Sequence, residues 1–77
     1  MRPVKRIEPI LKLLELIWKE HPDFRLGQLI GNVLEGPALY YIEDEDLVKY
    51  VAQYYGHDLE KLDPEAAEEL KKNSDDK

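Results

Sequence analysis

Apolar residues recur with the period of an α-helix in four separate segments of the chain. The most regular segment runs from about Ile7 to Glu20, where apolar residues follow the i, i+3, i+4, i+7 spacing of one helical face. These residues are Ile7, Ile10, Leu11, Leu14, Ile17 and Trp18. Leu13 and Leu16 widen this face and leave only a narrow polar line, which consists of Glu8, Lys12, Glu15 and Lys19. A helix this apolar must be covered on two sides, so we predict that it is the central helix of the core.

Three more helices are predicted from the same pattern and from the residues that start and stop helices. The second covers roughly residues 25–34 and the third about 45–55. The fourth runs over about 64–73, because Asp63 followed by Pro64 is a typical helix start. This last helix has few apolar anchors, and we therefore expect it to dock weakly. The anchors are Ala66, Ala67 and Leu70.

Residues 38–42, between the second and third helices, are partly apolar but too few to make a sheet without a partner strand. We expect an extended connector that docks on the core. Its contacts should be Leu39, Tyr41 and Ile42. The predicted fold class is all-α, a compact bundle of three main helices plus a weakly docked C-terminal fourth helix. We expect a single domain over residues 1–72 and a flexible polar tail over residues 73–77.

The composition agrees with one small globular domain. The chain has 77 residues, of which 43% are apolar and 36% charged. This is too apolar for a disordered segment, and the length allows a single small core. No apolar run is long enough to span a membrane, and Glu8 and Pro9 interrupt the N-terminal region where a signal peptide would be apolar. We therefore expect a soluble cytoplasmic protein without membrane association.

The net charge of −6 is spread unevenly along the chain. Residues 1–31 carry six basic and four acidic side chains, a net +2, whereas residues 32–77 carry five basic and thirteen acidic ones, a net −8. A duplex-binding domain normally has a basic stripe, because phosphate neutralisation supplies most of its affinity. Here only Arg2, Lys5 and Arg6 cluster. The charge therefore disfavours a nucleic-acid partner, and the acidic half better suits solubility or a basic protein partner.

Residues that carry out covalent chemistry are scarce. The chain contains no Cys and no Thr, and its one Ser, Ser74, lies in the polar tail. Only His21 and His57 titrate near neutral pH. We expect His21 to cap the end of the first helix and His57 to be a solvated loop residue. Carboxylate pairs are abundant in so acidic a chain and indicate no catalytic site by themselves. We predict that the protein is not an enzyme and binds no cofactor.

Four consecutive carboxylates, Glu43 to Asp46, stand at the start of the third predicted helix. Their simplest role is to cap that helix and to interact with the positive end of its dipole. Carboxylate oxygens at this density could instead hold Ca²⁺ or Mg²⁺, although the run lacks the alternate spacing and the glycine of an EF-hand loop. A third interpretation is an acidic knob that faces a partner.

Gly27 and Gly31 stand four residues apart inside the second predicted helix, although each costs about 1 kcal/mol relative to alanine. Close packing against a neighbouring helix is the interpretation that this spacing favours most. The alternative is that Gln28 and Asn32, which adjoin the glycines, form a hydrogen-bonding groove for a peptide or a small ligand.

Tyrosines supply most of the aromatic content of the chain. They are Tyr40, Tyr41, Tyr50, Tyr54 and Tyr55. Tyr50 and Tyr54 share one helical face beside the core face. Half-buried packing against the core is the favoured interpretation of the tyrosines. An interface is the alternative, because tyrosine buries a large area at low entropic cost.

Two motifs carry a resemblance to a known group of proteins. Residues 22–30 read PDFRLGQLI and residues 40–47 read YYIEDEDL. They resemble the PDLRLGQLI…YIEDDEL pattern of short uncharacterised prokaryotic and phage proteins, which are similar to the YihD-like domain of unknown function. The resemblance covers about residues 2–56. It implies a small helical protein without a known activity, and it draws attention to the residues that fall on the pattern. These are Arg25, Gln28, Asn32, Tyr41 and Asp44.

Together these observations predict a non-enzymatic helical module that binds an unidentified protein or peptide. The candidate contact residues are Arg25, Gln28, Asn32, Tyr41, Asp44 and Tyr50. The alternative function is the binding of a small ligand or a divalent metal by the acidic start of the third helix. A homodimer through the first helix is a further option, because the apolar face that includes Leu13 and Leu16 is wide for three short helices to cover.

Overall fold

Seven helical segments and no strand make up the part of the chain that the computed structural model describes, residues 4–74. In chain order they are the 3₁₀ turn η1 (Val4–Arg6), α1 (Ile7–Lys19), α2 (Leu26–Gly31), α3 (Pro37–Tyr41), α4 (Asp44–Tyr54), α5 (Leu59–Leu62) and α6 (Pro64–Ser74). The prediction of an all-α fold is confirmed. No helix within these residues is long and apolar enough to cross a membrane.

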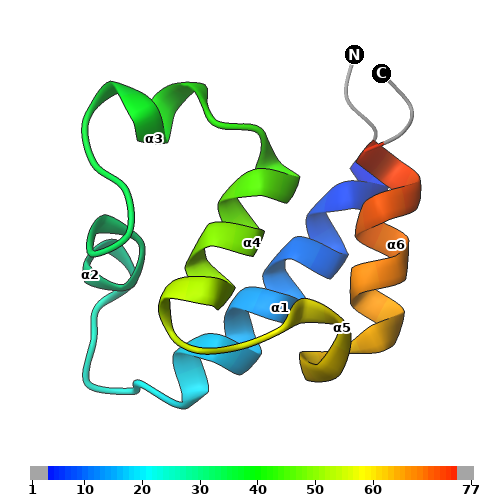
Figure 1. Cartoon of the computed structure of the whole chain (residues 1–77), viewed down its shortest axis with the longest axis horizontal. Helices are drawn as coiled ribbons and strands as arrows, with labels where there is room; N and C mark the ends of the chain where they lie inside the picture. Colours follow the sequence, from blue (N-terminus) through cyan, green and yellow to red (C-terminus); the bar gives the residue numbers. More distant parts are fainter. Residues whose placement is uncertain (1–3, 75–77) are drawn as a thin grey trace.

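α1 lies between α4 and α6 and packs against both of them (Figure 1). The buried side chains form two clusters that follow one another along α1. The first contains Leu13, Val48, Ala66 and Leu70. The second contains Ile17, Leu29, Val51 and Ala52. Because both clusters include a residue of α1, this helix is the centre of the core, as its apolar circumference predicts.

The face of α1 that points into the core differs from the expected one. Leu13 and Ile17, four residues apart, are fully buried and Pro9 is buried beside them. Ile7 and Leu11, which the pattern placed on the core face, remain 45% and 59% exposed. The reason is that α1 is apolar on two sides, and only the side that carries Leu13 meets α4 and α6. Leu13 therefore cannot take part in a dimer.

α6 contributes its three predicted anchors to the core. Ala66, Ala67 and Leu70 are all buried, and Leu70 shares a cluster with Leu13 of α1. The small alanine side chains let α6 approach its neighbours closely, and the Asp63 Oδ1 atom caps the helix by accepting a hydrogen bond from the Ala66 N–H at 3.1 Å. These contacts give α6 a larger share of the core than its few anchors suggested.

The region between α1 and α4 is more helical and more exposed than predicted. α2 spans only six residues of the expected 25–34 helix. The expectation of an extended connector over 38–42 is wrong, because these residues form most of α3. Gly36, at φ 64°, turns the chain into this helix, and Pro37 occupies its first position, where a missing N–H costs nothing. Leu39 and Tyr41 are exposed rather than docked, and only Ile42 is half-buried.

Two smaller differences complete the description. The short helix α5 was not predicted; the Asp58 Oδ1 atom caps it by accepting a hydrogen bond from the Glu60 N–H at 3.0 Å. The predicted flexible tail of residues 73–77 begins inside α6, which continues to Ser74. Residues 75–77 lie outside the described part of the chain.

Candidate interaction surfaces

The three predicted contact residues at α2 are exposed, and two of them have structural partners. The Gln28 Oε1 atom accepts a hydrogen bond from the Arg25 N–H at 2.8 Å and so caps the start of α2. The Asn32 Nδ2 atom donates to the Tyr55 hydroxyl at 3.4 Å. That hydroxyl donates in turn to the Leu29 carbonyl at 2.7 Å. Gln28 therefore stabilises the start of α2, and Asn32 connects α2 to Tyr55 at the end of α4.

The remaining predicted contact residues lie on two other helices. Tyr41 of α3 and Tyr50 of α4 are 78% and 53% exposed. Asp44, in the first turn of α4, forms an ion pair with Arg6, with 2.7 Å between Nε and Oδ2. This pair joins η1 to the start of α4. Asp44 is thus a link within the fold.

The acidic run takes the position that the helix-dipole interpretation predicts. Asp44, Glu45 and Asp46 form the first turn of α4, although the N-cap residue, Glu43, makes no side-chain hydrogen bond to the helix start. Glu45 faces Lys49 at 3.9 Å. Within residues 4–74, no group of three or more His, Asp or Glu side chains is arranged to hold a metal ion.

The two glycines of α2 do not allow a close helix contact. A Cβ atom built on Gly27 or Gly31 would meet nothing within 4 Å, and both residues are exposed. The interpretation that these glycines permit close packing is therefore wrong. Both glycines lie on the side of α2 that faces solvent, where no other helix packs against them.

Half-buried packing, the favoured interpretation of the tyrosines, is wrong for most of them. The exposed tyrosines are Tyr40, Tyr41, Tyr50 and Tyr54. Tyr55 alone among the five is half-buried, and its ring lies against the rings of His21 and Phe24 at centroid distances of 4.7 and 6.3 Å. His57 is also less exposed than expected: it is half-buried, and its Nε2 atom lies 3.2 Å from the Glu20 carboxylate.

An apolar groove between α1 and α2 is the main feature that sequence reasoning missed. It encloses about 590 Å³. Its lining consists of Leu11, Leu14, Glu15, Trp18, Lys19, Pro22, Leu26 and Ile30. The Trp18 side chain is among these lining residues, and a 2.7 Å hydrogen bond from its Nε1 atom to the Phe24 carbonyl holds the indole in place. We call this surface the α1–α2 groove.

The groove continues along α1 as a stripe of apolar side chains. Ile7, Leu11, Leu14 and Trp18 follow one another at steps of four, three and four residues, which is the spacing of the contact positions in coiled coils. We call these four residues the seam. This spacing can be read from the sequence. Because α1 is apolar on a second side as well, the sequence does not show which side remains uncovered in the fold.

A row of alternating charges borders the seam, one residue after each seam position. It consists of Glu8, Lys12, Glu15 and Lys19, all of them exposed. Lys19 pairs with Glu15 at 3.0 Å. The hydrogen bond and the positive charge of Lys19, with a smaller contribution from Lys12, lower the pKa of the Glu15 carboxyl from its ordinary value of 4.5. We call this row the charged rim.

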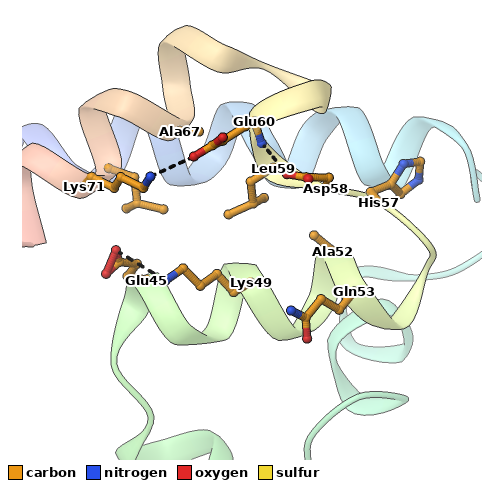
Figure 2. A pocket seen from close by; sticks show the side chains of 11 residues that line it. Glu45, Lys49, Ala52, Gln53, His57, Asp58, Leu59, Glu60, Ala67 and Lys71 are labelled. Carbon is orange, nitrogen blue, oxygen red and sulfur yellow. Dashed lines mark hydrogen bonds and ion pairs between the residues drawn. The ribbon is translucent and has the colours of Figure 1, made fainter.

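A second, polar cleft lies between α4 and the α5–α6 region and encloses about 450 Å³ (Figure 2). Its two lysines already have carboxylate partners. Lys71 contacts Glu60 at 2.8 Å, which raises the pKa of the Lys71 ammonium group, and Lys49 lies 3.9 Å from Glu45. The lining holds three carboxylates, Glu45, Asp58 and Glu60, and both of its lysines are paired, so the cleft offers an anion no unpaired lysine.

No family model, no curated protein and no solved structure matches this chain.

Proposed function

We propose that this protein is a non-enzymatic interaction module that binds an amphipathic helix of a protein partner in the α1–α2 groove. The observation that carries this proposal is the seam, of which Ile7 and Leu11 are exposed and Leu11, Leu14 and Trp18 line the groove. Contiguous apolar surface on a small soluble protein typically marks an interaction site. Leu11 of the seam and Leu26 of the opposite wall are 59% and 44% exposed, so both are available to a partner.

The shape of this surface suits a helix better than an extended peptide. Residues 7–18 of α1 extend over roughly 17 Å at 1.5 Å per residue, and their apolar side chains form one straight stripe. α2 provides a second wall through Leu26 and Ile30. A helix laid along two such walls buries side chains at every turn, as in other helix-in-groove complexes. A peptide that binds by strand addition would instead need a free sheet edge, and no strand is present in residues 4–74.

The polar residues predicted as contacts flank this surface rather than line it. Neither Gln28 nor Asn32 belongs to the groove lining. Arg25 directly precedes Leu26 and is exposed at the start of α2. We therefore assign binding to the apolar wall, while Gln28 and Asn32 hold α2 in position.

Trp18 provides a direct test, because it is the single tryptophan of the chain and lines the groove. We expect its fluorescence to shift saturably to shorter wavelength when a designed amphipathic helical peptide, with leucines at alternating steps of three and four, is titrated into the protein. A scrambled peptide of the same composition is the control, and it should produce no saturable shift. An equal response to both peptides would contradict the proposal.

A pair of matched variants locates the binding. Leu26→Lys places a charge on the groove wall and should weaken binding of the designed peptide at least about tenfold, or roughly 1.4 kcal/mol. Leu39→Lys alters a leucine of similar exposure on α3, 38% against 44%, and should leave binding unchanged. If both variants bind as the unaltered protein does, the peptide lies elsewhere.

A further inference from the structure

The charged rim has a symmetry of its own. Along α1 it reads Glu8, Lys12, Glu15, Lys19, and in the opposite direction it reads lysine, glutamate, lysine, glutamate. Two copies of α1 placed antiparallel therefore set every rim charge opposite a charge of the other sign. Glu8 would face Lys19 of the second copy, and Lys12 would face its Glu15. In a parallel twofold pair the two rims would lie on opposite sides of the contact, and their charges would not face one another.

The seam has the same symmetry. Its steps of four, three and four residues are identical when they are read from either end. An antiparallel pair centred between Leu11 and Leu14 places Ile7 opposite Trp18 of the second copy and Leu11 opposite its Leu14. The centre that pairs the seam lies within one residue, or about 1.5 Å, of the centre that pairs the rim. A twofold axis midway between these two centres leaves each seam pair and each rim pair displaced by only one residue, about 1.5 Å, along the helix.

The two halves of this surface also differ in shape, and the difference suits a twofold pair. The N-terminal half of the seam is the more exposed one, with Ile7 and Leu11 at 45% and 59%. Leu14 and Trp18, in the C-terminal half, are half-buried and line the groove together with Leu11, where α2 adds Leu26 and Ile30 as a wall. An antiparallel partner lays its exposed half into the groove of the first copy, and the twofold axis repeats this contact.

We propose that the helix bound in the α1–α2 groove is α1 of a second copy of this chain, which runs antiparallel and forms a twofold dimer. This inference rests on the proposed function and names the partner of the same site. A dimer was first expected from the wide apolar face that includes Leu13 and Leu16; the contact proposed here uses Ile7 and Leu11 instead. Leu13 is fully buried, whereas the seam is open.

Sedimentation equilibrium of the unmodified chain is the first experiment. We expect the average mass to rise from that of one 9.1 kDa chain toward that of two as the concentration increases from about 1 μM to about 1 mM. The result that overturns the inference is a constant mass of one chain over this range. If Trp18 still responds to the designed peptide in that case, the groove has a different partner and the proposed function stands.

Charge reversal along the rim tests the pairing. One variant carries Glu8→Lys and Glu15→Lys, and the other carries Lys12→Glu and Lys19→Glu, so each rim has a single sign. We expect each variant alone to dimerise at least about tenfold more weakly than the unmodified chain, and an equimolar mixture to recover the dimer. Circular dichroism checks that both variants retain their helices. Unchanged dimerisation of both variants overturns the rim pairing.

Single cysteines determine the direction of the two helices, since the chain has none of its own. In the antiparallel dimer, Glu8→Cys mixed with Lys19→Cys should form a disulfide between the two variants, and neither variant alone should form one. Positions 8 and 19 lie about 16 Å apart along a helix, which is too far for a disulfide. The antiparallel arrangement is overturned if the mixture forms no disulfide between the two variants, or if each variant alone forms one equally well.

Discussion

The two apolar sides of α1 use the same kinds of side chain and have different surroundings. Leu13 and Ile17 are fully buried between α4, α6 and α2, while Leu11, two residues from Leu13, is 59% exposed. Because leucine appears on both sides, residue type does not explain the difference. The helices that cover α1 determine which side becomes core, and the side left over becomes a surface that can bind.

The wall of the groove depends on how α2 is held. Leu29 is fully buried against Ile17 and Val51, and the Tyr55 hydroxyl donates to the Leu29 carbonyl at 2.7 Å. With Leu29 inward, Leu26 and Ile30 are left to line the groove. The buried side of α1 therefore also shapes the groove, because Ile17 packs with Leu29 and this contact positions α2.

Truncating one leucine on each side of α1 should give the largest contrast. Leu13→Ala removes a fully buried side chain and should lower the free energy of unfolding by about 2–5 kcal/mol, through lost burial and the cavity that remains. Leu11→Ala, in the same helix, should change it by less than about 0.5 kcal/mol in the monomer. Urea unfolding at low protein concentration, followed by circular dichroism, measures both. Equal losses would mean that the two sides are equally covered.

Removing the Tyr55 hydroxyl should cause the next largest loss in the free energy of unfolding. Tyr55→Phe deletes the hydrogen bond to the Leu29 carbonyl, and we expect a loss of about 0.5–1.5 kcal/mol in the free energy of unfolding. The loosened α2 should also change the fluorescence of Trp18 in the folded state. Tyr54→Phe is the matched control, because Tyr54 is 59% exposed, and its effect should be close to zero. A silent Tyr55→Phe would mean that the ring alone holds α2.

Replacing Gly27, a solvent-facing glycine of α2, should stabilise the fold, whereas the preceding substitutions destabilise it. Gly27→Ala should raise the free energy of unfolding by about 0.5–1 kcal/mol, because alanine restricts the unfolded chain and meets nothing in the folded one. Gly56→Ala provides the contrast: its φ of 81° disfavours a side chain, so we expect a loss of about 1–2 kcal/mol. Destabilisation by Gly27→Ala would restore the close-packing interpretation.

Much of this architecture could be predicted from local signals in the sequence. α1, α4 and α6 are long enough for apolar periodicity to appear, and Asp63 with Pro64 marks the start of α6 closely. α3 and α5, with five and four residues, are too short to show a period. The start of α3 depends instead on the positive φ of Gly36. A glycine permits this conformation, but its presence in the sequence does not predict it.

The binding surface was harder to predict, because it depends on contacts between distant segments. Asp44 pairs with Arg6 across 38 positions of the chain, so an acid that the sequence predicted as a contact residue has a partner within the fold. The Gln28 side chain folds back onto the backbone of Arg25. The seam is detectable as a spacing, but only the placement of α4 and α6 on the other side leaves it open.

The smallest predicted effect concerns the pKa of Glu15 at the edge of the seam. The Lys19 hydrogen bond and charge lower this pKa below its ordinary value of 4.5, so the pair stabilises the fold above that pH, and the contribution is lost as the pH falls through the lowered pKa. In dilute solution Lys19→Gln should raise the Glu15 pKa toward its ordinary value, and Lys12→Gln should raise it less, as measured by NMR titration of the carboxyl carbon. In the antiparallel dimer, Lys12 of the second copy also faces Glu15. The effect of Lys12→Gln should therefore grow at concentrations where the chain dimerises, and an effect independent of concentration would argue against this pairing.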